Sequence, residues 1–456
     1  ALGFATFTLT NSKLLKEFGL VASINIMLIF VLSLLIIPIM YSYMSIPKKK
    51  HLAHLSRKWM TGFVDWMERM VRHQRVGVYF VSVIALMLSV AGMYQIKLSG
   101  TIIDDLPRNT SFFEDIRFFE DQFNGVMPIE IMIDTKRKNG ATRLSTLNRL
   151  EKLDAYINEI PELSQSVSVL NVAKYFKQTY YNGNPSYFQL PTRQENSFIG
   201  SFVKNMSEET RLSGSLIDST GQFIRVSTML KDVSTARMEA IEAGLLAETA
   251  KLFPEENFEV TLTGKALGYL KGTRFLVRNL VVSLSLAILL IALFMAYTFR
   301  SFRMILISLI PNIIPLILTA GMMGFLGIPI KPSTILVFSV AFGISVDDTI
   351  HFLVKYRQEL QANKWRIKKS VYAALRETGV SMFYTSIVLF FGFSVFMISS
   401  YGGTVALGGL VSATLLFAML ANLILLPSLL LSLEESIANE RTLKEPRFEI
   451  LPDEEA

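Results

Sequence analysis

Cysteine is absent from this sequence of 456 residues, and only four histidines occur in it. The lack of cysteine excludes disulfide bonds and thiolate sites for metals or redox chemistry. The four histidines lack the spacing of zinc ligands, so we expect no metal centre. Charged residues make up only 18% of the chain, against about 25% in soluble proteins. This composition does not favour a soluble, disulfide-bonded or zinc-dependent protein.

The motifs of common enzyme classes are also missing. Gly264-Lys265-Ala266 resembles a fragment of a phosphate-binding loop, but Glu259 replaces the earlier glycine and Ala266 replaces the hydroxyl residue. The sequence contains no Gly-x-Ser-x-Gly turn and no His-Glu-x-x-His pair. We therefore expect no enzyme activity, no catalytic residues and no bound cofactor. Any energy that the protein uses is expected to come from an ion gradient.

Hydrophobic residues are abundant: they form 51% of the chain, and the mean hydropathy is +0.40. Runs of about 20 apolar residues are long enough for a helix to cross a bilayer, so we predict an α-helical polytopic membrane domain. An eighth, truncated span is expected at Ala1–Leu9. The seven complete runs are Phe18–Tyr43, Val76–Gln95, Leu280–Phe299, Met304–Ile328, Ser333–Val354, Val380–Ser399 and Val405–Leu433.

Basic residues gather in two short connections, Met44–Arg75 and Arg357–Arg376. The positive-inside rule places both connections in the cytoplasm, so the long stretch Lys97–Val277 lies outside. The net charge of +7 does not predict binding to nucleic acid, because the basic residues form no single basic and aromatic surface. Within the first connection, Leu52–Val71 has apolar residues at helical spacing. This helix is expected to lie in the cytoplasmic interface or to pack beneath the membrane domain.

The long external stretch has the pattern of a folded α+β domain. Strands alternate with helices in the order β-α-β-β-α-β, which predicts a split, ferredoxin-like unit inserted between two spans. The sequence shows no catalytic constellation in it. The expected elements are strands at Ile129–Asp134, Val167–Leu170, Phe223–Leu230 and Phe258–Thr263, and helices at Leu144–Ile160 and Thr235–Phe253.

An internal repeat relates the two ends of the chain at an offset of 389 residues. The pairs are Gly3 with Gly392, Phe4 with Phe393, Phe7 with Phe396, Gly19 with Gly408, Ser23 with Ser412, Leu34 with Leu423 and Pro38 with Pro427. A chance match of apolar segments is the alternative. We expect residues 1–43 to be the last two spans of a first repeat, 44–75 a cytoplasmic linker, 76–96 the first span of a second repeat, 97–277 the external domain, 278–433 five spans and 434–456 a cytoplasmic tail.

Two adjacent carboxylates, Asp347 and Asp348, lie inside the apolar run Ser333–Val354. Each costs about 2.5 to 3.5 kcal/mol at such a depth, and intramembrane acids are typical of ion or proton pathways. His351 follows Asp347 by one helical turn, so the two can interact. Gly343, one turn earlier, is expected to leave room for a neighbouring helix. We predict a proton relay through these acids; a buried polar pair that only fixes helix packing is the alternative.

The next span contributes three polar candidates, Tyr384, Thr385 and Ser386. They are expected either to relay protons or to hold helices together by hydrogen bonds. No linear signature identifies a substrate-binding site, because pockets for apolar molecules are lined by dispersed residues.

The segment Gly343-Ile-Ser-Val-Asp347-Asp348-Thr-Ile-His351, followed by Lys355-Tyr356-Arg357, resembles the fourth-span or tenth-span signature of resistance-nodulation-division (RND) transporters. Its Val-Asp-Asp-x-Ile core is similar to the multidrug branch. The Ile-His pair and the later Tyr-Arg are closer to the MMPL and sterol-sensing-domain-like exporters. Ile310-Pro311 through Pro329 and Thr385-Ser386 with Gly392-Phe393 resemble the ninth and eleventh spans.

The resemblance implies a pseudo-symmetric carrier of twelve spans in the bacterial inner membrane, with a periplasmic porter domain at residues 97–277. It also implies that protonation of Asp347 drives the cycle. Asp348 stands where the MMPL branch often has an aromatic residue, so the division of labour between the acids stays open. The expected partners are a hydrophobic or lipid cargo, the missing N-terminal half, further copies of the chain and a periplasmic adaptor or acceptor protein.

The predicted function is export of hydrophobic or amphiphilic molecules, including lipids, driven by the proton gradient. Two alternatives remain. One is a proton-powered accessory to Sec-dependent protein export, since such subunits share the fold and have a similar acidic span. The other is a sterol-sensing-like receptor or scaffold that binds lipid without pumping.

Overall fold

A computed structural model describes residues 13–44, 58–96, 105–195, 215–299 and 302–432, together with Ala5 and Thr8. The chain divides into two compact units. The first, which we call the helical unit, comprises Ala1–Lys97 and Phe275–Ala456; the second, the α+β unit, comprises Leu98–Arg274. The truncated span expected at Ala1–Leu9 and the tail at 434–456 fall almost entirely outside the described residues.

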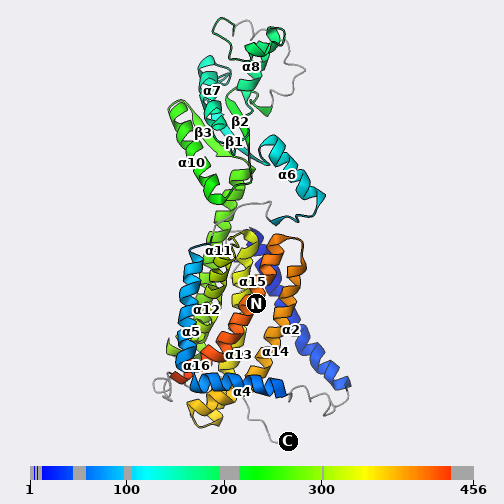
Figure 1. The fold of residues 1–456 in the computed structure, drawn as a ribbon, viewed down its shortest axis with the longest axis vertical. Coiled ribbons are helices and arrows are strands. Elements are labelled where there is room, and N and C mark those ends of the chain that lie inside the picture. The colour runs from blue at the N-terminus through cyan, green and yellow to red at the C-terminus, as the bar shows by residue number, and fades with distance from the viewer. Residues whose placement is uncertain are drawn as a thin grey trace. The chain divides into compact units, whose positions relative to one another are not determined.

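Seven helical stretches among the described residues are long and apolar enough to cross a membrane, in agreement with the predicted polytopic protein (Figure 1). These stretches are built from α2 (Lys13–Tyr43), α5 (Arg75–Met93), α11 (Lys265–Phe299), α12 (Phe302–Phe325), α13 (Pro332–Ala362), α14 (Ile367–Ser394) with the 3₁₀ turn η5 (Val395–Ile398), and α15 (Gly402–Leu420) with η6 (Ala421–Leu425) and α16 (Leu426–Ser432).

The core of the helical unit lies among α12, α13, α14 and the last helical stretch. About half of the most apolar window of α12 and of α13 is buried, and 72% of that of Gly402–Ser432. The corresponding window of α2 buries nothing. Because α2 is apolar on all sides, its surface is suited to lipid or to another apolar partner.

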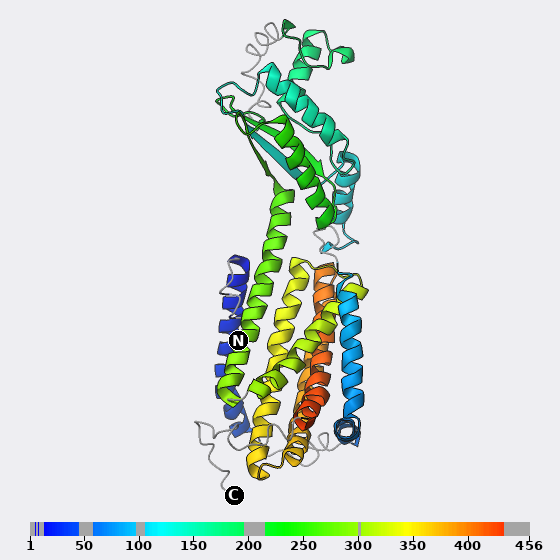
Figure 2. The same cartoon turned by 90° about the vertical axis from the view of Figure 1, so that its left-hand side faces the viewer.

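The amphipathic helix between the first two spans, α4 (Lys58–His73), runs across one end of the bundle (Figures 1 and 2). Met67 and Val71 are fully buried in the bundle core. Arg376 of α14 donates a hydrogen bond to Glu68 over 2.7 Å. One face of α4 therefore packs beneath the membrane helices, whereas Trp66 stays 42% exposed on another side.

Glycines allow α5 and α12 to approach closely. A methyl group on Gly321 would collide with the backbone of Ser89, and one on Gly324 would collide with the backbone carbonyl of Gly92. Small residues that let helix backbones meet are typical of membrane helix pairs, because dispersion contacts replace the hydrophobic effect there. The seam between α5 and α12 has no room for a larger residue.

The α+β unit is built on three strands, β1 (Met127–Asp134), β2 (Phe223–Leu230) and β3 (Glu259–Thr263), which form an antiparallel sheet in the order β2-β1-β3. Alternate residues of β1, namely Ile129, Ile131 and Ile133, are buried. They share a core with apolar residues of α7 (Leu144–Asn158) and α10 (Thr235–Leu252). Period-2 burial in the strands and period-3.6 burial in the helices explain why these five elements form where the sequence predicts.

The strand predicted at 167–170 is wrong, because α8 (Val169–Tyr180) begins there. Ser168 caps this helix: its hydroxyl accepts a hydrogen bond from the Leu170 amide, and the Asn171 side chain accepts one from the Ser168 amide. Such a capping box favours a helix start over a strand. Only isolated bridges, including Val167 to Ser227, extend the sheet beyond β2. The described residues thus form a three-stranded sheet and not the predicted four-stranded unit.

A further helix of the α+β unit, α6 (Ser111–Phe123), has no counterpart in the sequence-based prediction. Thr110 caps it by accepting a hydrogen bond from the Phe113 amide. Four of its phenylalanines, including Phe118 and Phe119, are more than half exposed.

An acidic side chain fastens the segment after α8 to that helix. The Glu195 carboxylate accepts hydrogen bonds from the Thr192 amide at 2.8 Å and from the Tyr181 hydroxyl at 2.9 Å. It also pairs with the buried Lys177 at 2.9 Å. These donors, the Thr192 amide foremost, lower the pKa of Glu195 from 4.5 to about 2. The carboxylate therefore stabilises the folded segment above pH 4.5, and this contribution disappears as the pH falls towards 2.

The glycine seam predicts that even a methyl group weakens the helical unit. Gly321→Ala and Gly324→Ala should each lower the free energy of unfolding by about 1 to 3 kcal/mol, as overpacking does in well-packed cores. Gly392→Ala is the control, since its added methyl would have no neighbour within 4 Å. Thermal unfolding of the detergent-solubilised protein measures the effect; equal midpoints for all three variants would contradict a tight seam.

The Glu195 contacts predict a pH-dependent protection of α8. In the natural chain, amide exchange in α8, corrected for the intrinsic rate, should accelerate as the pH falls from about 4.5 to about 2. Glu195→Gln should exchange faster already at pH 7 and respond less to acid. Glu159→Gln, which removes an exposed carboxylate in the same unit, should behave as the natural chain does. Identical profiles for Glu195→Gln and the natural protein would refute the assignment.

Candidate functional site

Asp347 and Asp348 lie at the midpoint of α13, a helix of 31 residues. The helix starts at Pro332, whose fixed φ suits the first turn, and the Lys331 amide donates to Thr334 Oγ1 over 2.9 Å. At about 1.5 Å per residue, both acids are about 22 Å from either end of α13. They are therefore located well inside this candidate membrane span and not at one of its ends.

The side chains of Asp347 and Asp348 line a groove between α13 and α14. This groove has a volume of about 720 Å³. The groove is lined on one side by Asp347, Asp348, His351 and Lys355, and on the other by Glu377, Ser381, Tyr384 and Thr385, with apolar residues between them. Most charged residues of the groove belong to α13. They share one face of this helix because side chains four residues apart lie one above the other.

The two carboxylates have different surroundings. Asp347 Oδ1 lies 3.7 Å from His351 Nε2, and both side chains are 72% exposed in this chain. Asp348 is half-buried and faces α14, where the Ser386 hydroxyl is its hydrogen-bonding partner. The turn of about 100° between neighbouring helical residues produces this divergence.

Charged residues continue from the acids towards the C-terminal end of α13. Lys355 follows His351 by one turn and pairs with Glu377 of α14 at 2.6 Å and with Glu359 at 3.4 Å. Asp347, His351, Lys355 and Glu359 thus form a row of ionisable groups, each one turn from the next. This row of ionisable groups extends from the middle of α13 towards its C-terminal end.

The other polar candidates are distributed unequally around the groove. Tyr384 and Thr385 line it, whereas Ser386 is buried. The Thr385 hydroxyl donates to carbonyls of its own helix, including that of Met382 at 3.0 Å. At Gly343, no atom of the described chain lies within 4 Å of an added Cβ. The open space at Gly343 leaves room for a neighbouring helix, and the packing of such a helix there stays a prediction.

A network of buried polar side chains lies behind the acids. Ser345 Oγ donates to Asn312 Oδ1 of α12 over 2.7 Å. Thr349 Oγ1 lies 3.1 Å from the same oxygen and 2.6 Å from Asn422 Oδ1. Asn422 Nδ2 in turn donates to the Ser345 carbonyl over 3.2 Å. All four side chains are at most 1% exposed. The network ties α12, α13 and η6 together.

This network is not among the features predicted from the sequence. Asn312 and Asn422 each interrupt an apolar span, which was the available signal, since buried amides in a membrane require partners. Asn422 lies in a π-helical stretch, Ala421–Leu425, which precedes Pro427. Proline has no amide hydrogen, so the Leu423 carbonyl loses its ordinary α-helical donor there. A π-helical turn is a common response to such an interruption and often marks functional positions.

Comparison with known proteins assigns this chain to a family. The MMPL family profile matches residues 203–450, more than half of the chain, including the whole of α13 and α14. A Methanocaldococcus jannaschii protein named "Putative membrane protein" is 30% identical over 129 residues. That match covers 28% of this chain and 33% of the relative, so the chain matches about a third of the relative's length.

The matched region and the seven candidate spans agree with the resemblance seen in the sequence. The chain belongs to the MMPL family and is a multi-pass membrane protein of the MMPL/RND type.

Proposed function

We propose that this chain is part of a proton-driven transporter of hydrophobic or amphiphilic molecules, lipids included, and that Asp347 and Asp348 carry the proton. The observation that carries the proposal is the position of two adjacent acids at the midpoint of α13, in a groove with a row of ionisable groups. Membership of the MMPL family supports transport of lipids or other hydrophobic molecules.

Two carboxylic acids inside a membrane-spanning helix are energetically costly. An ionised carboxylate in hydrocarbon is unfavourable by several kcal/mol, whereas its neutral form costs far less. A change in water access to the groove would therefore change the proton occupancy of the acids. Two adjacent acids in a medium of low dielectric also resist simultaneous ionisation, which favours a pair that exchanges one proton at a time.

The row of ionisable groups supplies a route for that proton. His351 lies 3.7 Å from Asp347, and Lys355 bonds to Glu377 and Glu359 near the end of α13. Histidine changes its charge near neutral pH, so it can pass a proton between an acid and water. In this proposal Asp347 and His351 exchange the proton with the end of the span, and Asp348 communicates the change to α14 through Ser386.

The exposure of the Asp347 and His351 side chains bears on which helices surround the site. Asp347 and His351 are 72% exposed in the isolated chain, which in a bilayer would direct a carboxylate towards lipid. That arrangement is costly, so we propose that a second helical repeat covers this face. In the same proposal the membrane is the bacterial inner membrane and the α+β unit is its periplasmic porter domain.

We expect Asp347→Asn and Asp348→Asn, alone and together, to abolish transport that depends on a pH gradient, because an amide does not exchange protons. The assay uses the whole transporter in proteoliposomes, with a fluorescent phosphatidylethanolamine as cargo and a trapped pH-sensitive dye to follow protons. Asp65→Asn, which removes an exposed acid of α4, is the control and should transport normally. Gradient-driven transport that survives in the double variant would disprove the proposal.

The buried network should behave differently, since it stabilises the bundle and is not part of the proposed proton route. Thr349→Val leaves Asn422 without its hydroxyl partner and should lower the free energy of unfolding by about 1 to 3 kcal/mol. The folded fraction should still transport. Ser428→Ala is the control, because the buried Ser428 hydroxyl donates to a carbonyl of its own helix and lies outside the Asp347 groove. Loss of proton flux in stably folded Thr349→Val would instead make this hydroxyl part of the route.

A further inference from the structure

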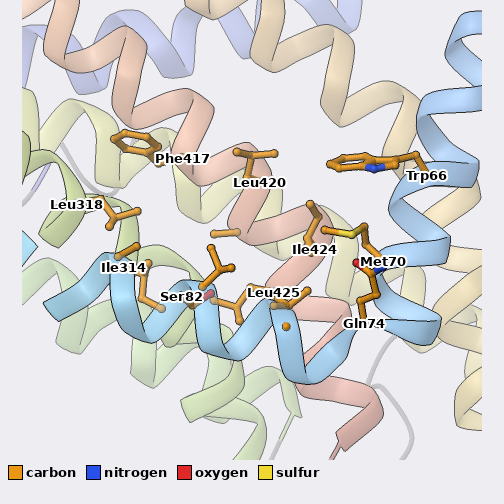
Figure 3. A pocket seen from close by; sticks show the side chains of 15 residues that line it. Trp66, Met70, Gln74, Ser82, Ile314, Leu318, Phe417, Leu420, Ile424 and Leu425 are labelled. Carbon is orange, nitrogen blue, oxygen red and sulfur yellow. The ribbon is translucent and has the colours of Figure 1, made fainter. Parts of the chain in front are cut away.

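A second groove of the helical unit lies on other helices and has a different lining. It has a volume of about 370 Å³ and is formed by α4, α5, α12, α15 and η6, with no residue from α13 or α14. Figure 3 shows Trp66, Met70 and Gln74 at one end and Leu318 and Phe417 at the other. Gln74 and Ser82 are its polar lining residues, so most of its wall is apolar.

A basic depression adjoins the polar end of this groove. It has a volume of about 440 Å³ and is lined by residues 72–77, including Arg72, His73 and Arg75. Gln74 and Gly77 line both hollows, so the two are adjacent. Within the described part of the chain, neither Arg72 nor Arg75 forms an ion pair, whereas Arg376 and Lys355 at the same end of the bundle are paired with carboxylates.

The dimensions match one leaflet of a bilayer. From Gln74 to Ala85, the groove follows α5 for about 16 Å, roughly half of a hydrocarbon core about 30 Å thick. The exposed Trp66 indole lies beside the polar end of the groove, and tryptophan is enriched near the headgroups in membrane proteins. Gly77 leaves open space, since an added Cβ would meet no atom within 4 Å.

We propose that this groove holds an anionic phospholipid of the surrounding bilayer. Its phosphate binds at Arg72 and Arg75, and one acyl chain lies along α5 between Gly77 and Ala85. Charge complementarity selects the headgroup, because basic pockets next to spanning helices attract anionic lipid headgroups. The apolar wall and the length of the groove suit the acyl chain of the lipid. This lipid is a resident ligand that fills the space between α4 and α5, on other helices than the Asp347 groove.

The test measures lipid binding directly and does not depend on transport. The purified full chain in detergent is titrated with palmitoyl-oleoyl phosphatidylglycerol or with the corresponding phosphatidylcholine, and bound lipids are counted by native mass spectrometry. We expect one phosphatidylglycerol molecule to bind more tightly than phosphatidylcholine. Arg72→Gln with Arg75→Gln should weaken phosphatidylglycerol binding by about fivefold per arginine and leave phosphatidylcholine binding nearly unchanged. Gly77→Trp should weaken the binding of both lipids, because the indole occupies the chain groove.

Matched controls distinguish a specific lipid-binding site from general effects of charge and side-chain size. Lys364→Gln with Lys369→Gln removes two exposed positive charges elsewhere, and Gly392→Trp adds an indole where a Cβ has open space; both should bind phosphatidylglycerol normally. A phosphatidylglycerol with a photoreactive group at the end of its acyl chain should label Phe417 or Leu420 in the natural protein, a readout that needs no variant. Equal affinity for the two lipids, equal loss in the lysine variant, or labelling confined to other helices would overturn the proposal.

Discussion

Hydrocarbon supplies no hydrogen bonds, so every polar side chain inside the bundle needs a partner, and this constraint sets the rotation of α13. Ser345 and Thr349, one turn apart, are turned inward to Asn312 and Asn422. A residue two positions further on lies about 200° around the helix. Asp347 and His351 therefore have to project away from α12 and η6, into the groove with α14. The buried amides thus determine where the acids point.

The bundle is consequently asymmetric. On the side of α5 and α12, glycines at 92, 321 and 324 bring the backbones together and leave no space for rearrangement. On the side of α13 and α14, Gly343 has open space, and the groove between the two helices is polar. Small residues let the backbones of α5 and α12 meet, whereas the groove keeps part of the α13 and α14 surfaces apart.

The sequence predicts the elements whose signals are local. Apolar runs locate the seven spans, alternation locates the three strands, and four-residue spacing places His351 beside Asp347. The spans are nevertheless longer than their apolar runs: α13 continues to Ala362, because the residues after Val354 include strong helix formers. Local signals also mislead at Val169: the valines at 167 and 169 favour a strand, whereas the cap at Ser168 starts a helix.

What the sequence could not supply depends on residues far apart in the chain. The partners of Asn312 are 33 and 37 residues away, and Asn422 meets Ser345 across 77. Neither asparagine shows by spacing which helix it faces. The lipid groove likewise depends on the position of α4 across the end of the bundle. This position places Arg72 and Arg75 at the end of a groove lined by α15 and η6. A basic cluster read in the sequence indicates membrane topology, and the same cluster seated at an apolar groove becomes a site for a particular class of lipid.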